Sequence, residues 1–131
     1  MAAKSMVVSV KERSQEANYM LAVIPGNRKV NMKRVKRSLN VYDVSLAPYE
    51  KAGELTYCQM GAVPPFSFHR DLFVIVDPLL MENEEIVFNA GLLDTSIAMK
   101  AEDYLKAVQP HSIMEISAAI ETDNHKHILQ I

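Results

Sequence analysis

Short apolar runs separated by polar turns dominate the hydrophobic pattern of this chain. Residues 5–11 and 19–24 are rich in apolar and β-branched side chains, and the polar stretch 12–18 lies between them. Two such runs with a polar connector predict a β-hairpin. The turn residues Pro-Gly-Asn at 25–27 then end the second strand. Residues 41–46 alternate well enough to predict a third strand.

The second half of the chain continues in shorter pieces. Residues 72–76 read Leu-Phe-Val-Ile-Val, and a continuous apolar run of this length predicts a central, buried strand. We then expect one helical turn, two short strands, a helix and a last strand, at 79–84, 85–88, 95–99, 100–108 and 113–116. The segment 121–131 is polar up to Ile128 and gives no clear prediction.

Two further helices are expected in the first half. Asn31 is a suitable N-cap for a helix through Leu39, and Met32, Val35 and Leu39 recur on one face of it. Pro48 favours the start of a second helix through about residue 55. Strands outnumber helices, so we expect a single α+β domain over residues 1–131 with a mixed, curved, half-barrel-like sheet and short flanking helices.

The segment 61–67, Gly-Ala-Val-Pro-Pro-Phe-Ser, precedes the strongest strand. Pro64 and Pro65 each fix a backbone angle and remove a donor, which makes the segment stiff. Gly61 adopts backbone angles closed to other residues and lets a ligand approach the main chain. The pattern alone indicates either a rigid turn that enters a strand or a preshaped functional loop.

Composition narrows the environment in which the protein works. The net charge of −2 gives no overall attraction to polyanions, and the one cysteine, Cys58, excludes an intramolecular disulfide. These features favour a reducing compartment. No apolar run is long enough to cross a bilayer and no signal-peptide pattern begins at Met1. We therefore expect a cytoplasmic protein without a membrane partner.

Basic residues gather in and around the first predicted helix. They are Arg28, Lys29, Lys33, Arg34, Lys36 and Arg37. A solvated helix face explains this cluster, and so does contact with a phosphate backbone, which needs clustered Lys and Arg but no special spacing. The sequence leaves both interpretations open.

Common catalytic patterns are missing from the chain. His125 and His127 flank a lysine without a cysteine or carboxylate at ligand spacing, and His69 and His111 are isolated. Cys58 has no partner base nearby in the sequence. There is no nucleophile elbow, phosphate-binding glycine loop or dinucleotide fingerprint. The sequence therefore predicts no metal and no cofactor.

Several segments, taken in order, resemble the family of YbaK-like aminoacyl-tRNA deacylases, which includes the editing domain inserted in bacterial prolyl-tRNA synthetases. The resemblance rests on Lys4 before the first strand, a Gly-x-x-x-Pro loop from Gly61 to Pro65, a strand that ends in Asp77 and an Asn-Ala-Gly turn. The matching segments are residues 3–8, 22–26, 56–66, 74–77, 87–91 and 96–99.

The resemblance implies hydrolysis of the ester that joins a wrong amino acid to the 3′ end of tRNA, with tRNA-Pro carrying Ala or Cys as the expected substrate. Catalysis would involve Lys4 near the terminal adenosine and main-chain groups of the loop marked by Gly61 and Pro65. A water assisted by the substrate's own hydroxyl would attack the ester. Substrate would also contact a wider set of residues: Ala62, Val63, Pro64, Phe66, Asn89, Ala90, Gly91 and Ser96.

The same resemblance makes the basic cluster a candidate for the tRNA backbone, through Arg28, Lys29, Lys33, Arg34 and Arg37. The chain also departs from the family, because Tyr57 and Ser67 stand where glycine is common and only three residues precede Lys4. The family's N-terminal helix and strand are thus expected to be lacking.

Two other functions remain open. A non-catalytic module would bind tRNA or a nucleotide in the same pocket without turnover. An interaction protein would use an open sheet edge at residues 5–11 to form a homodimer.

Overall fold

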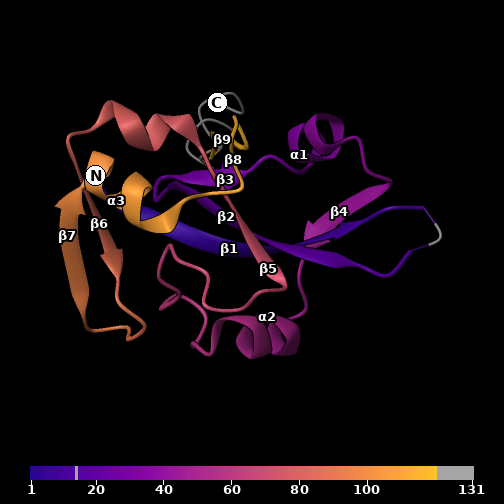
Figure 1. Ribbon diagram of the computed structural model, residues 1–131, viewed down its shortest axis with the longest axis horizontal. Coiled ribbons are helices and arrows are strands. Elements are labelled where there is room, and N and C mark those ends of the chain that lie inside the picture. The colour runs from indigo at the N-terminus through magenta and orange to yellow at the C-terminus, as the bar shows by residue number, and fades with distance from the viewer. Residues whose placement is uncertain (14, 121–131) are drawn as a thin grey trace, which may run out of the picture.

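The computed structural model describes residues 1–13 and 15–120, and within them a five-stranded sheet forms the centre of the molecule (Figure 1). The sheet order is β4-β1-β2-β5-β8. These strands span Asp43–Leu46, Ala3–Lys11, Asn18–Pro25, Leu72–Val76 and Ser112–Ile113. β1 is antiparallel to both of its neighbours, whereas β2, β5 and β8 run parallel. The sheet is mixed and does not close into a barrel, so the predicted α+β class is confirmed.

The β1–β2 hairpin sorts apolar side chains onto two faces. Val7 is opposite Leu21 and Val8 is opposite Met20, and successive side chains of a strand point to opposite sides. Val7 and Leu21 belong to one buried cluster, whereas Val8 and Met20 belong to another. The predicted hairpin is therefore confirmed, and it contributes to two cores at once.

Helices cover the sheet on opposite sides. α2 (Tyr49–Thr56) and α3 (Ala101–Val108) pack on the Val7 face, which we call the α2 side. α1 (Met32–Leu39) packs on the Val8 face, which we call the α1 side, and Figure 1 shows α1 and α2 far apart across the sheet. The predicted cap of α1 is confirmed, because the Asn31 side chain accepts a hydrogen bond from the Arg34 amide.

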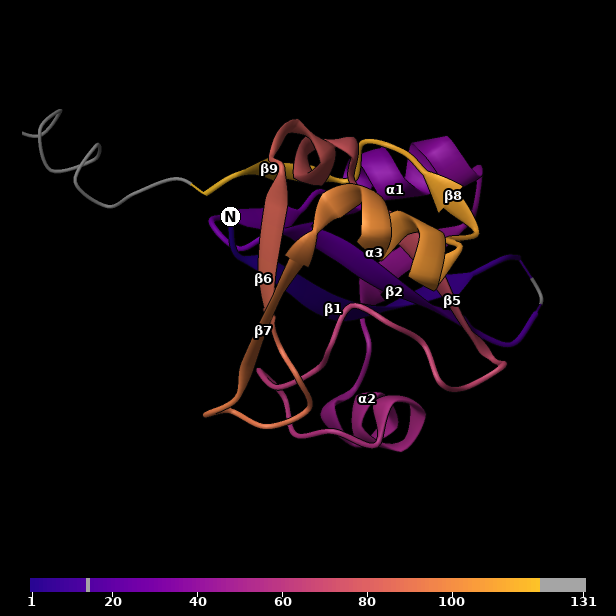
Figure 2. The same cartoon turned by 60° about the vertical axis from the view of Figure 1, so that its left-hand side comes forward.

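A second ribbon stands at one end of the sheet. β6 (Glu85–Asn89) and β7 (Ser96–Lys100) form an antiparallel pair that follows a 3-10 turn, η1 (Pro78–Glu82). Figure 2 shows that the loop of this ribbon lies next to the segment that follows α2. The predicted strand–turn–strand around Asn89, Ala90 and Gly91 is thus present.

One prediction about strands is wrong, and one strand was not predicted. The segment 113–116 is not one strand, because β8 ends at Ile113 and β9 (Ser117–Ala119) begins after a break. The cause is Asp77, whose carboxylate accepts hydrogen bonds from the Ile116 amide and the Ser117 hydroxyl. β9 instead pairs with β3 (Arg28–Val30), a strand that the hydrophobic pattern did not predict.

The predicted open edge at residues 5–11 is also wrong. β4 pairs with Val8–Lys11, and the Ala47 amide donates to the Val7 carbonyl. At the other end, the Val87 amide donates to the Met1 carbonyl. Only a short stretch of β1 around Lys4 and Ser5 remains as an open edge. The edge that we expected to form a homodimer is therefore already paired within the chain.

Two observations concern membrane spans and the described part of the chain. No helix among the described residues is long and apolar enough to cross a membrane. His125, His127 and the whole segment 121–131 lie outside the described residues. The extent of the domain over residues 1–131 therefore stays a prediction.

Candidate functional site

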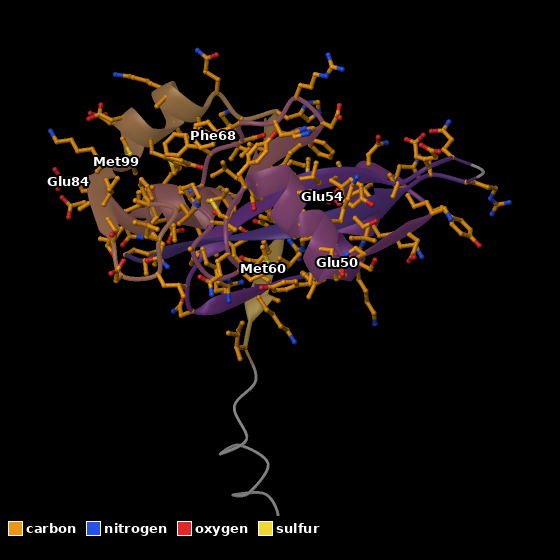
Figure 3. The ribbon with its side chains drawn as sticks, turned by 90° about the horizontal axis from the view of Figure 1, so that it is seen from below. Glu50, Glu54, Met60, Phe68, Glu84 and Met99 are labelled. Carbon is orange, nitrogen blue, oxygen red and sulfur yellow. The ribbon has the colours of Figure 1, made fainter. Side chains whose placement is uncertain are left out.

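A cavity of about 310 Å³ lies between the short edge of β1 and the loop that follows α2. Four residues predicted for the site line it: Lys4, Gly61, Val63 and Asn89. The other lining residues are Ala3, Ser5, Met6, Val7, Leu46, Ala47, Tyr49 and Met60. Apolar side chains thus make up most of the wall, and Figure 3 shows Met60 beside α2 on this side of the molecule.

Hydrogen bonds join the loop after α2 to the Asn-Ala-Gly turn. The Asn89 side chain donates to the Gly61 carbonyl over 2.5 Å, and the Gly91 amide donates to the Ala62 carbonyl over 3.0 Å. Ser96 donates to Asn89 Oδ1 over 3.5 Å. Two segments about 30 residues apart in the sequence are therefore held as one wall of the cavity.

Gly61 gives this wall its shape. It has φ +89°, and the Ala62 amide donates to the Gln59 carbonyl across the same turn. A glycine is favoured there because a side chain makes a positive φ costly. Gly91 has φ +92° for the same reason. The two glycines are thus required by backbone conformation, as the sequence pattern indicated for Gly61.

The turn also leaves backbone donors available at the cavity. Within residues 1–13 and 15–120, the amides of Gly61 and Val63 have no hydrogen-bond partner, whereas the Ala62 amide between them has one. Both residues line the cavity. Unpaired backbone N–H groups beside a cavity can bind a carbonyl oxygen or a developing oxyanion.

Lys4 lies at the strand edge opposite this loop. It pairs with Ile24, a residue of the α1-side core, so its Cβ begins on the α1 side of the sheet. Lys4 nevertheless lines the cavity, because β4 does not cover this part of β1. A lysine at a rim is a flexible point charge that can meet a phosphate or ribose oxygen.

A family model described as the aminoacyl-tRNA editing domain matches residues 1–107. The chain belongs to the aminoacyl-tRNA editing domain family. A curated relative, the multifunctional Ser/Thr-tRNA deacylase ProXp-y of Escherichia coli (strain K12), is 38% identical over 112 residues. That match includes 85% of this chain and 66% of the relative, so the chain spans just under two thirds of its length.

A second curated relative agrees with the family assignment, and a solved structure agrees with the fold. The proline–tRNA ligase of Bacillus cytotoxicus is 31% identical over 74 residues, which are 56% of this chain and 12% of the ligase. A solved structure of a candidate trans-editing enzyme for prolyl-tRNA synthetase has a TM-score of 0.75 at 18% identity, over 90% of this chain and 71% of that one. At that identity the structural match supports the fold alone.

Several residues predicted to contact substrate are not among those that line the cavity. Ala62 is fully buried and Pro65 is buried. Phe66 packs edge-on against Phe88 and Tyr104. None of these lines the cavity, and neither do Pro64, Ala90, Gly91 and Ser96. Their contact with substrate stays a prediction.

Tyr104 is a support that the sequence did not reveal. Its hydroxyl donates to the Pro65 carbonyl over 2.6 Å, and its side chain is fully buried. Burial raises the pKa of this hydroxyl well above its usual value. The hydroxyl therefore stays protonated and keeps the loop attached to α3.

The basic cluster lies away from the cavity, on the α1 side. Arg28 donates to Ser117 Oγ over 2.8 Å, and Arg34 forms an ion pair with Glu115. Lys29, Lys33 and Arg37 are exposed. The cluster is therefore part structural and part solvent-facing, and its contact with tRNA stays a prediction.

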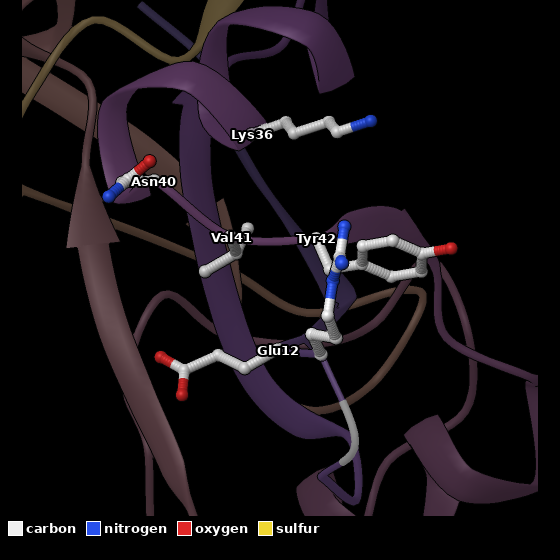
Figure 4. A pocket seen from close by; sticks show the side chains of 6 residues that line it. Glu12, Lys36, Asn40, Val41 and Tyr42 are labelled. Carbon is white, nitrogen blue, oxygen red and sulfur yellow. The ribbon is translucent and has the colours of Figure 1, made fainter.

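A larger hollow, of about 730 Å³, lies at the far end of the β1–β2 hairpin (Figure 4). Its wall includes Glu12, Lys36 and Tyr42, and the guanidinium carbon of Arg13 lies 5.3 Å from the ring centre of Tyr42. No predicted site residue lines this hollow. The smaller cavity is the better candidate for the site because it unites Lys4 with the glycine loop.

Proposed function

We propose that this editing domain hydrolyses mischarged aminoacyl-tRNA in the cavity between Lys4 and Gly61. One observation carries the proposal: Gly61 and Val63, whose amides have no hydrogen-bond partner within the described residues, line a mostly apolar cavity that Lys4 also lines. Such a cavity suits an aminoacyl group, and the amides suit the ester that attaches it. The name of the relative, a tRNA deacylase, supports the same activity.

In the proposed reaction, a water oxygen bonds to the ester carbonyl carbon. The carbonyl oxygen becomes an oxyanion, which the amides of Gly61 and Val63 stabilise. One such donor contributes about 3–4 kcal/mol in known oxyanion holes. The ester C–O bond then breaks, the ribose oxygen takes a proton that originates from the water, and the free amino acid and tRNA leave.

The proton path runs through the substrate. Among the described residues that line the cavity, Lys4 and Tyr49 are the titratable ones, and neither is a carboxylate or an imidazole. The neighbouring ribose hydroxyl of the terminal adenosine is placed to pass the proton from water to the leaving oxygen. Lys4 binds a phosphate or ribose oxygen and holds the adenosine in register.

The size of the cavity favours small amino acids. A volume of about 310 Å³ lies at the lower end of the usual range for ligand sites, and part of it must hold the ribose. Ala and Cys on tRNA-Pro are the predicted substrates. The name of the curated relative adds Ser and Thr to the set that we would test.

The test is a deacylation assay with tRNA-Pro charged with Ala, Cys, Ser or Thr. We expect amino-acid release above the uncatalysed rate for at least one of them, and a loss of about tenfold or more in Lys4→Ala. Lys11→Ala is the matched control, because Lys11 lies exposed at the far end of the same strand. Release equal to background from folded protein contradicts the proposal, and binding of uncharged tRNA without release indicates the non-catalytic module.

A further inference from the structure

Ser5 carries a buried hydroxyl that nothing in the fold explains. In the part of the chain that the structure describes, Ser5 Oγ is the buried side-chain oxygen without a hydrogen-bond partner. An unpaired buried polar group typically costs about 1–3 kcal/mol of stability, so such groups are rare and call for a reason. The other buried polar side chains, Thr56, Asp77 and Ser117, all have partners.

The position of Ser5 connects this hydroxyl with the candidate site. Ser5 pairs with Val23, a residue of the α2-side core, so its side chain lies on the side of the sheet where the cavity is. Lys4 and Met6, its neighbours, begin on the other side. Ser5 itself lines the cavity. Oγ itself is covered, so it reaches a ligand in the cavity by rotation about χ1, which has three staggered positions.

The wall around Ser5 offers little other polar contact to an amino-acid side chain. Val7, Ala47, Met60 and Val63 line the same cavity with apolar groups. The Asn89 amide is already bonded to the Gly61 carbonyl. Tyr49, on the exposed start of α2, carries the other neutral hydroxyl of the wall. Ser5 Oγ differs from it because it is buried and unpaired, so a hydrogen bond with a substrate hydroxyl would satisfy it.

We propose that Ser5 selects the aminoacyl group, by forming a hydrogen bond between Ser5 Oγ and a hydroxyl on the β-carbon of that group. Resting on the proposed function, this inference names seryl and threonyl esters as the preferred class and ranks the alanyl ester below them. A cysteinyl ester falls between, because a thiol is a weaker hydrogen-bonding group. Ser5 is a specificity residue in this scheme, since the Gly61 and Val63 amides stabilise the oxyanion and water attacks the ester. Sites built to bond a substrate hydroxyl reject analogues without it far better than apolar pockets reject an added hydroxyl.

The test compares Ser5→Ala with the unchanged protein on one tRNA body charged with Ser, Thr or Ala. We expect kcat/KM for the seryl and threonyl esters to fall about tenfold or more, which corresponds to one lost hydrogen bond, while the alanyl ester changes less than about twofold. Ser9→Ala is the matched control, because Ser9 lies on the same strand and the same face but does not line the cavity. Equal change for all three esters, or none, overturns the proposal.

A binding measurement separates this inference from the proposed function. The probes are 3′-amino-linked seryl and alanyl adenosine, which cannot be hydrolysed. We expect the seryl probe to bind more tightly than the alanyl probe, with the difference lost in Ser5→Ala. If no ester is hydrolysed but this difference in binding is found, the proposed deacylase function is contradicted and the proposed role of Ser5 is supported. If esters are hydrolysed without this difference in binding, the proposed role of Ser5 is contradicted and the proposed deacylase function is supported. Thermal unfolding of Ser5→Ala checks folding, and its midpoint should not fall, because the lost hydroxyl has no partner.

Discussion

Gly61 is the residue on which the shape of the site most depends. Its φ of +89° lies in the left-handed region, and a Cβ there would come within 3.3 Å of Leu93 Cδ2. The exposed Leu93 side chain can move, so the main cost of a side chain is backbone strain of about 1–2 kcal/mol. Relief of that strain would change the orientation of the Gly61 and Val63 amides.

We therefore expect Gly61→Ala to lower kcat/KM about tenfold or more and the free energy of unfolding by about 1–2 kcal/mol. Urea unfolding and the deacylation assay measure the two effects. Gly53→Ala is the matched control: a Cβ at Gly53 meets nothing within 4 Å, and alanine in a helix gains about 1 kcal/mol over glycine. If the two variants have equal activity, the conformation of Gly61 has no role in catalysis.

Tyr104 makes the stability of the fold depend on pH. Its folded pKa is raised above the unfolded value near 10, so the protonated hydroxyl contributes stability that is complete below pH 10. Above pH 10 the unfolded state loses this proton and the folded state keeps it, so stability falls as pH rises. Tyr104→Phe should cost about 1–3 kcal/mol at pH 7, since the buried Pro65 carbonyl loses its donor.

The pH dependence supplies the sharper measurement for Tyr104. The difference in unfolding free energy between the protein and Tyr104→Phe should shrink between pH 9 and 11. Tyr42→Phe is a suitable control, because that side chain is 56% exposed. A constant difference over this range would show that Tyr104 does not titrate differently in the two states.

At the scale of elements, Asp77 connects the end of β5 to two other segments. Its carboxylate accepts from the Leu79 amide over 2.9 Å, from the Ile116 amide over 3.0 Å and from Ser117 Oγ over 2.7 Å. It is 1% exposed, so water cannot replace it. One side chain thus caps η1 and fixes where β9 begins.

We expect Asp77→Asn to destabilise the fold by about 2–4 kcal/mol, although it keeps the shape of the side chain. An amide has one acceptor oxygen, so its NH₂ group must face either the Leu79 amide or the donors of Ile116 and Ser117. Chemical unfolding measures the loss, and Asp71→Ala, an exposed side chain, should change stability by less than about 0.5 kcal/mol. A similar small change in Asp77→Asn would mean that these bonds are not needed.

Elements with a local signal were predictable from the sequence. The β1–β2 hairpin follows from two apolar runs, α1 from its Asn31 cap and spacing, and β5 from one continuous run. β3 and β9 were not predictable, because three-residue strands leave no period to detect. The break at Ile116 depends on Asp77, which is 39 residues away.

The candidate site also contains residues that the sequence predicts and residues that it does not. Gly61 and Asn89 carry a pattern that can be read from the chain, and the structure brings both to one cavity. Ser5 and Tyr49 line it too, yet a serine in a strand and a tyrosine at the start of a helix are ordinary by sequence. Their significance depends on which edge of β1 stays uncovered, and long-range pairing decides that.

At the scale of the whole molecule, the cavity opens at the uncovered edge of β1 next to α2, whereas the basic cluster lies on the α1 side of the sheet. The outer face of α2, beside the cavity, carries Glu50 and Glu54 (Figure 3). Acidic side chains there repel phosphates, and Lys51, the cation of α2, pairs with Glu54 over 3.6 Å. A tRNA whose 3′ end enters the cavity would therefore gain little backbone attraction from α2, and its charge must be met elsewhere.

Among the described residues, the exposed cations in and around α1 are the concentrated source of that charge. We expect Lys33→Glu combined with Arg37→Glu to raise KM for charged tRNA several-fold with kcat retained. Each lost phosphate contact should also flatten the slope of log affinity against log salt, by about 0.7–0.9. Lys106→Glu, on α3, is the control for a general change in charge. If the double variant keeps the full salt slope, α1 does not touch the tRNA, and the substrate must be held by its acceptor end alone.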